Sequence, residues 1–400
     1  MATLVGAATL SPTPNPPKPE IRVSSAKEEA FQNWVASYKR QAAARGVPQR
    51  VLDQAFRAVR YNEEVIEKDR NQAEFSLAIW DYLGRIVSDE QVRNGRAALR
   101  RHRRSLQAIE DRYGVDKEVV VAVWGAETRY GETRGDISVV EATATLAFDG
   151  RRGRFFRSQL DETINILIRG DTTARNLKGS WAGAMGHTQF IPSSYRAYAV
   201  DFDGDGRRDI WANDPTDALA STAAYLKRFG WRQGQPVAVE VRLSKGADVS
   251  LARRSFVLSP AQWAARGVTG LDGKPLPNYG QASLFLPAGA AGPAFLTFNN
   301  FRVLERYNAA EAYVLAVGNL ALRVGGAGPI QGSWPVGSRP LKRAEIQELQ
   351  ERLTAAGFST QGADGLMGPN TTNAIRQYQR ARGLKVDGFA SLDLLADLKR

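Results

Sequence analysis

Residues 116–131 read Asp-Lys-Glu-Val-Val-Val-Ala-Val-Trp-Gly-Ala-Glu-Thr-Arg-Tyr-Gly, the most informative segment of the chain. Asp116 is a residue type that favours the N-terminal cap of a helix, and Gly131 is a type that ends one. The residues between them are mostly apolar and include no proline. We therefore predict a helix from Asp116 to Tyr130.

One carboxylate of this segment falls in register with its apolar side chains. Four residues share one helical face at the spacing i, i+3, i+4, i+7: Val120, Val123, Trp124 and Glu127. Surroundings poor in water raise the pKa of a carboxyl group, and a raised pKa suits a general acid near neutral pH. Glu127 is thus a candidate catalytic acid. The alternative is a structural ion pair of Glu127 with Arg129 or Arg134.

Composition sets the class of protein. The chain has 400 residues, which is enough for two or three domains, and 43% hydrophobic with 24% charged residues is typical of a globular protein. No apolar run reaches the roughly 18–20 residues that span a membrane. The chain has no cysteine and two histidines, His102 and His187, which excludes disulfides, thiol nucleophiles and a His-rich zinc site.

The charge balance points to an anionic partner. There are 54 Lys and Arg against 42 Asp and Glu, a net charge of +12, which suits nucleic acid, an anionic membrane or an anionic wall polymer. The run Arg100–Arg104 lies in a predicted long helix, 89–112, and either grips a polyanion or forms a solvated helix face. Basic residues are not interleaved with aromatic ones, so we expect no nucleic acid partner.

The rest of the chain divides by composition. Residues 1–25 are Pro-rich and read as a disordered tail or as the remnant of a signal peptide. Helical periodicity dominates 26–323, interrupted at about 233–300 by strand-like alternation, which predicts a small β-containing insertion. Residues 324–340 are rich in Gly and Pro and form a linker. Residues 341–400 form a separate unit with three short helices and two Asp-Gly turns, which suggests an internal duplication.

Two polar segments inside the helical region are candidates for binding. Residues 179–195 combine glycines, small residues and hydroxyl side chains, which allow close approach of a ligand and hydrogen bonds to sugars; His187 within them reads as a binding or structural residue. The loop 201–217 places Asp201, Asp203 and Asp205 at positions 1, 3 and 5 of an EF-hand-like loop. Position 12 is not Glu, so a regular EF-hand is excluded, and the alternatives are a bound Ca²⁺ or an Asx-turn loop held by arginines.

These segments, in this order, resemble the lytic murein transglycosylases of the membrane-bound type B family. The resemblance covers roughly 28–323 and is carried by Val123-Trp-Gly-Ala-Glu-Thr-Arg-Tyr-Gly131, Ser180-Trp-Ala-Gly-Ala-Met-Gly-His-Thr-Gln-Phe190 and the loop that ends in Ile210-Trp211. Residues 341–398 separately resemble the peptidoglycan-binding domain type 1, through Leu349-Gln350, Asp364-Gly-Leu-Met-Gly-Pro369 and Ala374-Ile-Arg-Gln-Tyr-Gln379.

The resemblance implies a mainly α (α+β) protein, with a lysozyme-like helical catalytic domain, a small β-containing insertion and a small C-terminal three-helix domain. It implies cleavage of the β-1,4 bond between N-acetylmuramic acid and N-acetylglucosamine, with formation of 1,6-anhydromuramoyl ends. Glu127 would be the single acid/base, assisted by the 2-acetamido group of the substrate. The alternatives are a hydrolytic muramidase and a non-catalytic wall-binding protein.

The family's other functional residues carry over to positions of this sequence, and no organic cofactor is implied. Calcium would be held by an EF-hand-like set: Asp201, Asp203, Asp205, Arg207 through its carbonyl, and Asp217. Substrate would be bound by a second set: Ser180, Gln189, Tyr225, Tyr307, Asn308, Tyr313 and Tyr82.

Two features depart from the family, and the resemblance also sets expectations for location and partners. His187-Thr188 replaces the pair commonly found before the glutamine, and the lipobox cysteine of membrane-bound members is absent. We expect a periplasmic, soluble rather than lipid-anchored monomer that binds peptidoglycan glycan strands. Further partners would come from wall synthesis or remodelling.

Overall fold

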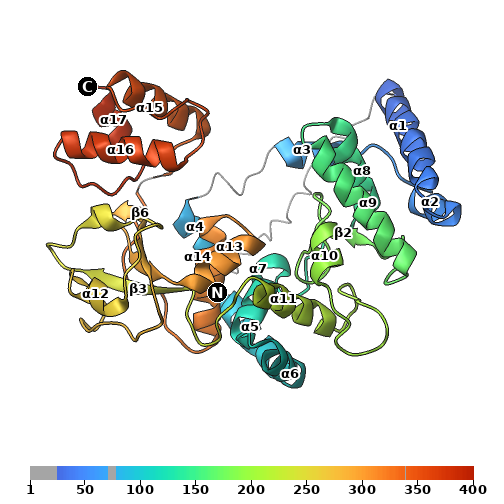
Figure 1. The fold of residues 1–400 in the computed structure, drawn as a ribbon, viewed down its shortest axis with the longest axis horizontal. Helices are drawn as coiled ribbons and strands as arrows, with labels where there is room; N and C mark the ends of the chain where they lie inside the picture. The colour runs from blue at the N-terminus through green and yellow to red at the C-terminus, as the bar shows by residue number, and fades with distance from the viewer. Residues whose placement is uncertain (1–24, 71–77, 338) are drawn as a thin grey trace, which may run out of the picture.

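The computed structural model describes residues 25–70, 78–337 and 339–400 (Figure 1). The predicted tail lies outside these residues, except for Ser25, where the first helix begins. Buried apolar side chains form three clusters: a large one in the helical body, a second in the β-rich region and a third near the C-terminus. Within the described residues, no helix is both long and apolar enough to cross a membrane.

The helical body is built around one central helix, α7 (Lys117–Thr128), whose residues 119–125 are all buried. It packs against α5, α6, α11 and α14. Because α7 is covered on several sides, its sequence is apolar nearly all round. The other helices of the body are α1 (Ser25–Ala44), α2 (Gln49–Ala55), α3 (Glu63–Arg70), α4 (Ile79–Ile86), α5 (Asp89–Arg101), α6 (Arg103–Tyr113), α8 (Val139–Asp149), α9 (Gly153–Arg169), α10 (Pro192–Tyr198), α11 (Thr216–Arg228), α13 (Asn299–Tyr307) and α14 (Glu311–Val324).

Two helix predictions need correction. The single helix predicted over 89–112 is wrong: the chain leaves helical geometry at His102, so that α5 packs on α7 and α14 while α6 packs on α11. The helix predicted over 116–130 ends at Thr128, because Arg129 and Tyr130 adopt left-handed backbone angles. The helical periodicity that resumes near 300 is confirmed, as the two helices α13 and α14.

Asp116 occupies the predicted cap position of α7 without capping it. Its carboxylate accepts hydrogen bonds from the indole of Trp231 at 2.8 Å and the backbone N–H of Gly234 at 2.9 Å. The side chain therefore ties the start of α7 to the segment that leads into the β-rich region, a contact between residues more than a hundred positions apart.

The predicted β-containing insertion is a four-stranded antiparallel sheet with strand order β4-β3-β7-β5. Its central pair aligns Val239 with Leu296 and Glu240 with Phe295. The buried indole of Trp263, on the short helix α12 (Pro260–Ala264), packs in the cluster beneath it. The strands of the protein are β1 (Ile137–Ser138), β2 (Lys178–Gly179), β3 (Ala238–Leu243), β4 (Val268–Thr269), β5 (Ser283–Phe285), β6 (Pro287–Ala290) and β7 (Ala294–Thr297).

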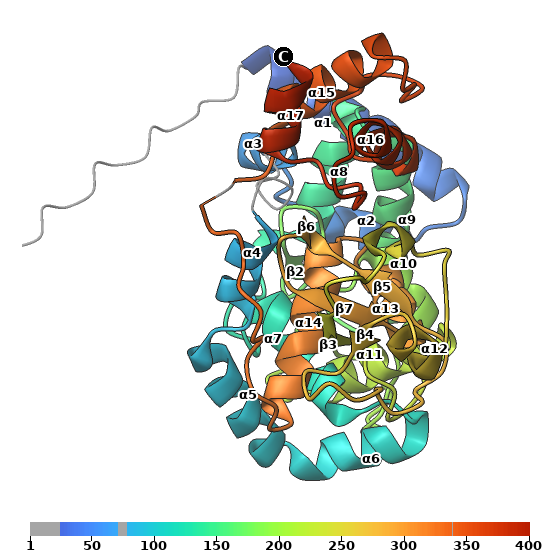
Figure 2. The same cartoon turned by 90° about the vertical axis from the view of Figure 1, so that its left-hand side faces the viewer.

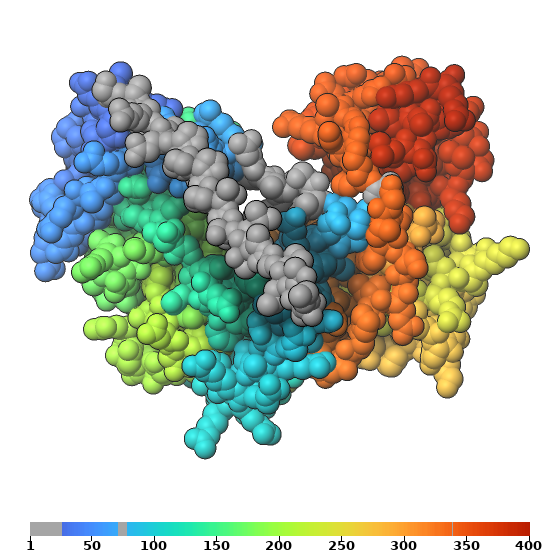
Figure 3. All heavy atoms as spheres, turned by 180° about the vertical axis from the view of Figure 1, so that it is seen from behind, coloured from blue at the N-terminus to red at the C-terminus, as the bar shows by residue number. Residues whose placement is uncertain are grey.

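The C-terminal unit has the three short helices that the sequence predicts: α15 (Arg343–Ala355), α16 (Pro369–Ala381) and α17 (Leu392–Leu398). Figures 1 and 2 show it beside the β-rich region, and Figure 3 shows it at the opposite end of the molecule from α1 and α2. The two regions touch, because the backbone N–H of Ala290 donates to Asp387 Oδ2 at 2.9 Å.

Candidate active site

Glu127 lies in the last turn of α7 and is half-buried. The hydroxyl of Tyr313, on α14, donates a hydrogen bond to Glu127 Oε1 at 2.6 Å. Burial and then the negative charge of Glu127 hold the pKa of Tyr313 well above its usual range, so this hydroxyl keeps its proton. Burial and then the charge of Glu127 also raise the pKa of Tyr307, and Tyr82, on α4, packs half-buried against the same core. The structure therefore brings two predicted tyrosines, Tyr307 and Tyr313, near the predicted acid.

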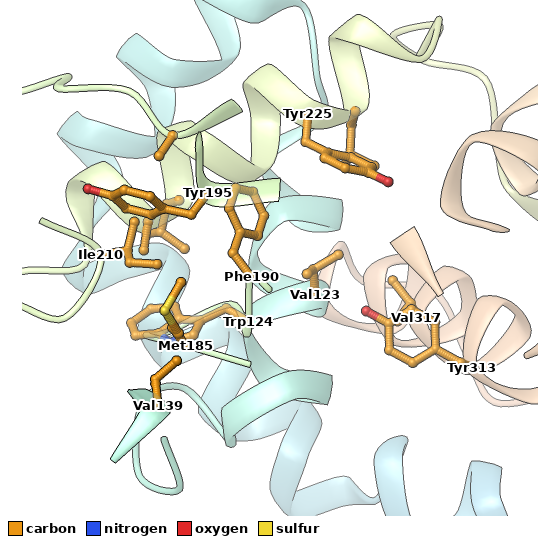
Figure 4. Packing of buried hydrophobic residues seen from close by; sticks show 14 of the residues in the cluster. Val123, Trp124, Val139, Met185, Phe190, Tyr195, Ile210, Tyr225, Tyr313 and Val317 are labelled. Atoms are coloured by element: carbon orange, nitrogen blue, oxygen red, sulfur yellow. The ribbon is translucent and has the colours of Figure 1, made fainter. Parts of the chain in front are cut away.

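Figure 4 shows the buried apolar residues around α7: Tyr313 directs its hydroxyl toward the side where Val123 of α7 lies, and Trp124 lies beside Met185. Tyr307 donates to the carbonyl of Thr188 at 2.6 Å and so joins α13 to the 179–195 segment. Tyr225 donates to the carbonyl of Arg306, and its ring lies 5.0 Å from the ring of Tyr307. Ring packing and hydrogen bonds of these two tyrosines thus join α11, α13 and the 179–195 segment next to Glu127.

The end of α7 is shaped by two left-handed residues, Arg129 (φ 51°) and Tyr130 (φ 62°). This backbone folds the Tyr130 ring back over α7, where its hydroxyl donates to the carbonyl of Gln91 at 2.7 Å. A Cβ atom at Gly125 would lie 2.6 Å from the Tyr130 ring. Gly125 therefore makes room for the turn that follows Glu127, a reason that the local sequence does not reveal.

His187 is a structural residue and is 4% exposed. Its Nδ1 accepts from the indole of Trp124 at 3.1 Å, so the ring proton resides on Nε2, which lies 2.7 Å from the carbonyl of Ala212. Thr128 donates to the His187 carbonyl at 2.6 Å. Burial lowers the pKa of the His187 imidazole, which keeps it neutral. These hydrogen bonds hold α7 against the 179–195 segment. The sequence pattern predicts no such role for Trp124 or Thr128.

Three further predicted site residues each hold a local turn. Ser180 Oγ accepts from the backbone N–H groups of residues 182 and 184. Gln189, which has a left-handed φ of 55°, donates to the carbonyls of Arg134 and Gly186. Asn308 Oδ1 accepts from the N–H that precedes α14. Contact of these residues with a sugar remains a prediction.

The other carboxylates near the end of α7 have different partners. Glu132 is exposed and lies 3.6 Å from Arg129 Nε. Glu141 accepts hydrogen bonds from the side chain of Asn62 at 2.8 Å and the backbone of Arg60 at 3.3 Å. Both groups serve local structure, so neither offers the second carboxylate that paired-acid glycosidases use.

The acidic loop gathers three carboxylates. Asp201, Asp203 and Asp205 are exposed, and their ligand oxygens lie within 4.8 Å of one another. Asp217 is outside this group and is buried; it accepts from the backbone N–H groups of Phe202 at 2.8 Å and of residue 209 at 2.9 Å. Burial raises the pKa of Asp217.

The donor set of this loop fits a hard divalent cation such as Ca²⁺, which prefers carboxylate and carbonyl oxygens. Three close carboxylates repel one another unless a cation lies between them. The backbone N–H of Arg207 donates to Asp205 Oδ1 at 2.8 Å, which holds this part of the loop.

A separate hollow of about 390 Å³ lies between β3, α14 and residues 328–331. None of the predicted site residues lines it. The hollow therefore does not mark the site around Glu127.

Comparison with known proteins agrees with this architecture. The family model of the transglycosylase SLT domain matches residues 30–322, and the model of a peptidoglycan binding domain matches residues 342–398. The chain is 38% identical over 247 residues to membrane-bound lytic murein transglycosylase B of Escherichia coli (strain K12). That match covers 61% of this chain and 66% of the relative, just under two thirds of its length.

Two solved structures extend the comparison. SltB3 from Pseudomonas aeruginosa, in complex with NAG-anhNAM-pentapeptide, is 45% identical with a TM-score of 0.89, covering 92% of this chain and 99% of that one. The Escherichia coli lytic transglycosylase Slt35, in complex with calcium, is 32% identical with a TM-score of 0.63, covering 76% and 94%. The chain belongs to the SLT-domain family of lytic transglycosylases and carries a C-terminal peptidoglycan-binding domain.

Proposed function

We propose that this chain cleaves the β-1,4 bond between N-acetylmuramic acid and N-acetylglucosamine of peptidoglycan and leaves a 1,6-anhydromuramoyl end. The observation that carries the proposal is the hydrogen bond from Tyr313 to Glu127, which holds one carboxyl group in place at the end of the central helix. The family match over residues 30–322 supports the same reaction.

In the first step Glu127 is the general acid. It donates its proton to the glycosidic oxygen, the bond from that oxygen to the anomeric carbon breaks, and the N-acetylglucosamine-side product leaves with a new hydroxyl. The carbonyl of the substrate's 2-acetamido group stabilises the positive anomeric carbon.

In the second step Glu127, now a carboxylate, is the general base. It takes the proton from the muramic 6-hydroxyl, whose oxygen bonds to the anomeric carbon and closes the anhydro ring. No water is consumed, and Glu127 returns to its protonated form. The Tyr313 hydroxyl stabilises the carboxylate between the two steps, because a hydrogen bond to an ionised group is stronger than one to a neutral group.

A single carboxylate suffices for this sequence because the substrate supplies the second group. The contacts of Glu132 with Arg129 and of Glu141 with Asn62 support this reading, since both carboxylates are engaged in local structure. The aromatic rings of Tyr225, Tyr307 and Phe190 reduce the access of water, which favours ring closure over hydrolysis.

We also propose that the acidic loop binds Ca²⁺ through Asp201, Asp203, Asp205 and the carbonyl of Arg207. Asp217 would close the loop, which it already braces through its backbone hydrogen bonds. The ion neutralises the clustered carboxylates and fixes the loop; it takes no part in bond cleavage. The complex of Slt35 with calcium supports this assignment.

The C-terminal unit, 341–400, is proposed to retain the enzyme on insoluble peptidoglycan, and the basic net charge adds attraction to its carboxylates. A monomer located in the periplasm fits this substrate. Removal of 341–400 should weaken sedimentation with insoluble wall material more than it slows cleavage of short soluble fragments. Equal losses in both assays would contradict a targeting role.

The decisive experiment is mass spectrometry of the soluble products released from purified peptidoglycan. We expect muropeptides one water lighter than hydrolysis products from the native chain, none from Glu127→Gln, and native activity from the matched control Glu132→Gln. Products of full hydrolytic mass would make the enzyme a muramidase. Products from Glu127→Gln would refute the assignment of the acid, and no products from the native chain would favour the wall-binding alternative.

A further inference from the structure

The two Asp-Gly turns of the C-terminal unit carry the same hydrogen-bond network. In the first turn, Gln350 accepts from the N–H of Gly365 at 2.9 Å and donates to Asp364 Oδ1 at 3.1 Å. In the second, Gln379 accepts from the N–H of Gly388 at 2.9 Å and donates to Asp387 Oδ1 at 2.7 Å. The predicted internal duplication is therefore a repeated helix–turn–helix unit.

The likeness extends to the surroundings of each turn. Both glycines are left-handed, with φ of 72° at Gly365 and 74° at Gly388. An arginine side chain lies against each glycine and donates to the carbonyl of the preceding aspartate: Arg343 in the first turn and Arg376 in the second. Each turn then leads to the N-cap of a helix three residues after its glycine. Carboxylate, arginine and following apolar residue thus occupy equivalent places.

The second turn is engaged with the polypeptide of the β-rich region. Asp387 Oδ2, the oxygen not used inside the turn, accepts from the backbone N–H of Ala290 at 2.9 Å. Arg376 donates to the backbone carbonyl of Ala252 at 2.5 Å. Phe389 packs on Gly289, where an added Cβ would lie 2.9 Å from it. This turn therefore recognises an amide N–H, a carbonyl and a residue without a side chain.

The first turn presents the same groups to solvent. Asp364 and Arg343 are exposed, and Asp364 Oδ2 has no hydrogen bond within residues 25–70, 78–337 and 339–400. Leu366, at the place of Phe389, is 57% exposed, and Met367 is 43% exposed. These two apolar side chains adjoin each other and follow the exposed carboxylate of Asp364.

We infer that the first turn binds the peptide stems of peptidoglycan in the way that the second turn binds the Gly289–Ala290 segment. Asp364 Oδ2 accepts an amide N–H of the stem, Arg343 donates to a stem carbonyl or carboxylate, and Leu366 covers the methyl group of an alanine. The inference rests on the proposed function, which makes peptidoglycan the substrate. It adds that the C-terminal unit binds the peptide part of peptidoglycan rather than the glycan part.

Peptide fits this surface better than glycan does. The second turn contacts backbone amide groups and small residues of the β-rich region, and a stem peptide contains both. Arg343 makes no ion pair within the described part of the chain, so it is available to the carboxylates that stems carry. The glycan chain offers hydroxyl and acetamido groups, whereas the stems add free carboxylates for Arg343 and successive backbone amides like those that the second turn contacts.

The test compares binding of the full chain to two insoluble polymers: intact peptidoglycan and peptidoglycan from which an amidase has removed the stems. Glu127→Gln is present in every sample to prevent digestion. Asp364→Asn keeps the acceptor that Gln350 and the turn require but replaces Oδ2 with a donor. We expect it to weaken sedimentation with intact peptidoglycan by about tenfold and to leave binding to the stripped glycan unchanged.

Asp387→Asn is the matched control, because it makes the same chemical change in the docked turn; it should not alter stem binding. Leu366→Ala, at an exposed position that leaves the fold intact, should also weaken binding to intact peptidoglycan alone. Equal losses on both polymers, no loss on either, or an equal effect of Asp387→Asn would each overturn the inference. Failure of the proposed function shows separately, as an absence of anhydro products from the chain with Glu127 restored.

Discussion

Replacement of Gly125 by alanine separates helix propensity from packing at the active site. Inside a helix, alanine is more stable than glycine by about 1 kcal/mol. The added Cβ would lie 2.6 Å from the Tyr130 ring, which must move. Overpacking of this kind costs about 1–3 kcal/mol, and loss of the Tyr130 hydrogen bond to Gln91 costs about 1 kcal/mol more. The expected balance is a net destabilisation of about 1–3 kcal/mol.

The assay is the thermal unfolding midpoint of the full chain, with Gly84→Ala as the matched control. Gly84 is exposed inside α4, and an added Cβ there would meet no atom within 4 Å. Gly84→Ala should raise the midpoint, and Gly125→Ala should lower it by roughly 2–4 °C for each kcal/mol lost. Anhydro-product formation should also slow in Gly125→Ala alone, since Glu127 is two residues away on the same helix.

The double variant Gly125→Ala/Tyr130→Ala distinguishes the steric cause from a general weakness of α7. It removes the ring that the new Cβ strikes, so the effect of Gly125→Ala measured in the Tyr130→Ala background should be neutral or stabilising. The reasoning is refuted if Gly125→Ala stabilises the chain as Gly84→Ala does, or if the alanine costs as much without the Tyr130 ring as with it.

Three further predictions address the acid, the loop and the pH dependence. Tyr313→Phe removes the hydrogen bond to Glu127 and should lower kcat by roughly 10–100-fold with little change in KM; unchanged steady-state kinetics would exclude a role for the hydroxyl. Calcium should raise the thermal midpoint of the native chain and raise it less in Asp203→Asn, whereas equal shifts would contradict the loop site. His187 stays neutral in the folded chain because burial lowers its pKa, whereas in the unfolded chain its imidazole takes up a second ring proton below about pH 6.5, so stability should fall as the pH decreases through that value. His187→Gln should flatten this slope in midpoints measured at pH 7.5 and 5.5, and an unchanged slope would contradict it.

The structural features that the sequence predicts well are formed by residues close together in the chain. The acidic loop follows from the spacing of three aspartates, and the C-terminal helices follow from their periodicity and two Asp-Gly turns. The β-containing insertion follows from alternation around Val239. In each case the residues that define the element lie within one short stretch, so their pattern is visible without the fold.

What the sequence does not predict depends on distant contacts. Tyr313 donates a hydrogen bond to Glu127 although the two residues are 186 positions apart, and the periodicity of neither helix predicts this contact. The break at His102 depends on how α5 and α6 pack on different helices. Asp116 resembles a cap but bonds to Trp231, because a buried indole N–H requires an acceptor. Each of these outcomes is decided by a partner that is far away in the chain.

The docked C-terminal unit changes how retention on the wall should be understood. A flexible linker raises the effective concentration of a tethered module, and its orientation is free. Here Glu240 accepts from the backbone N–H groups of residues 331 and 332, and Trp334 stacks on Phe295, so the linker lies along the body. Asp387 fixes the far end of the unit. Because both ends contact the body, we expect the turn at Asp364 to keep one position relative to Glu127, and a stem captured there would restrict which bonds of the same strand can reach the acid.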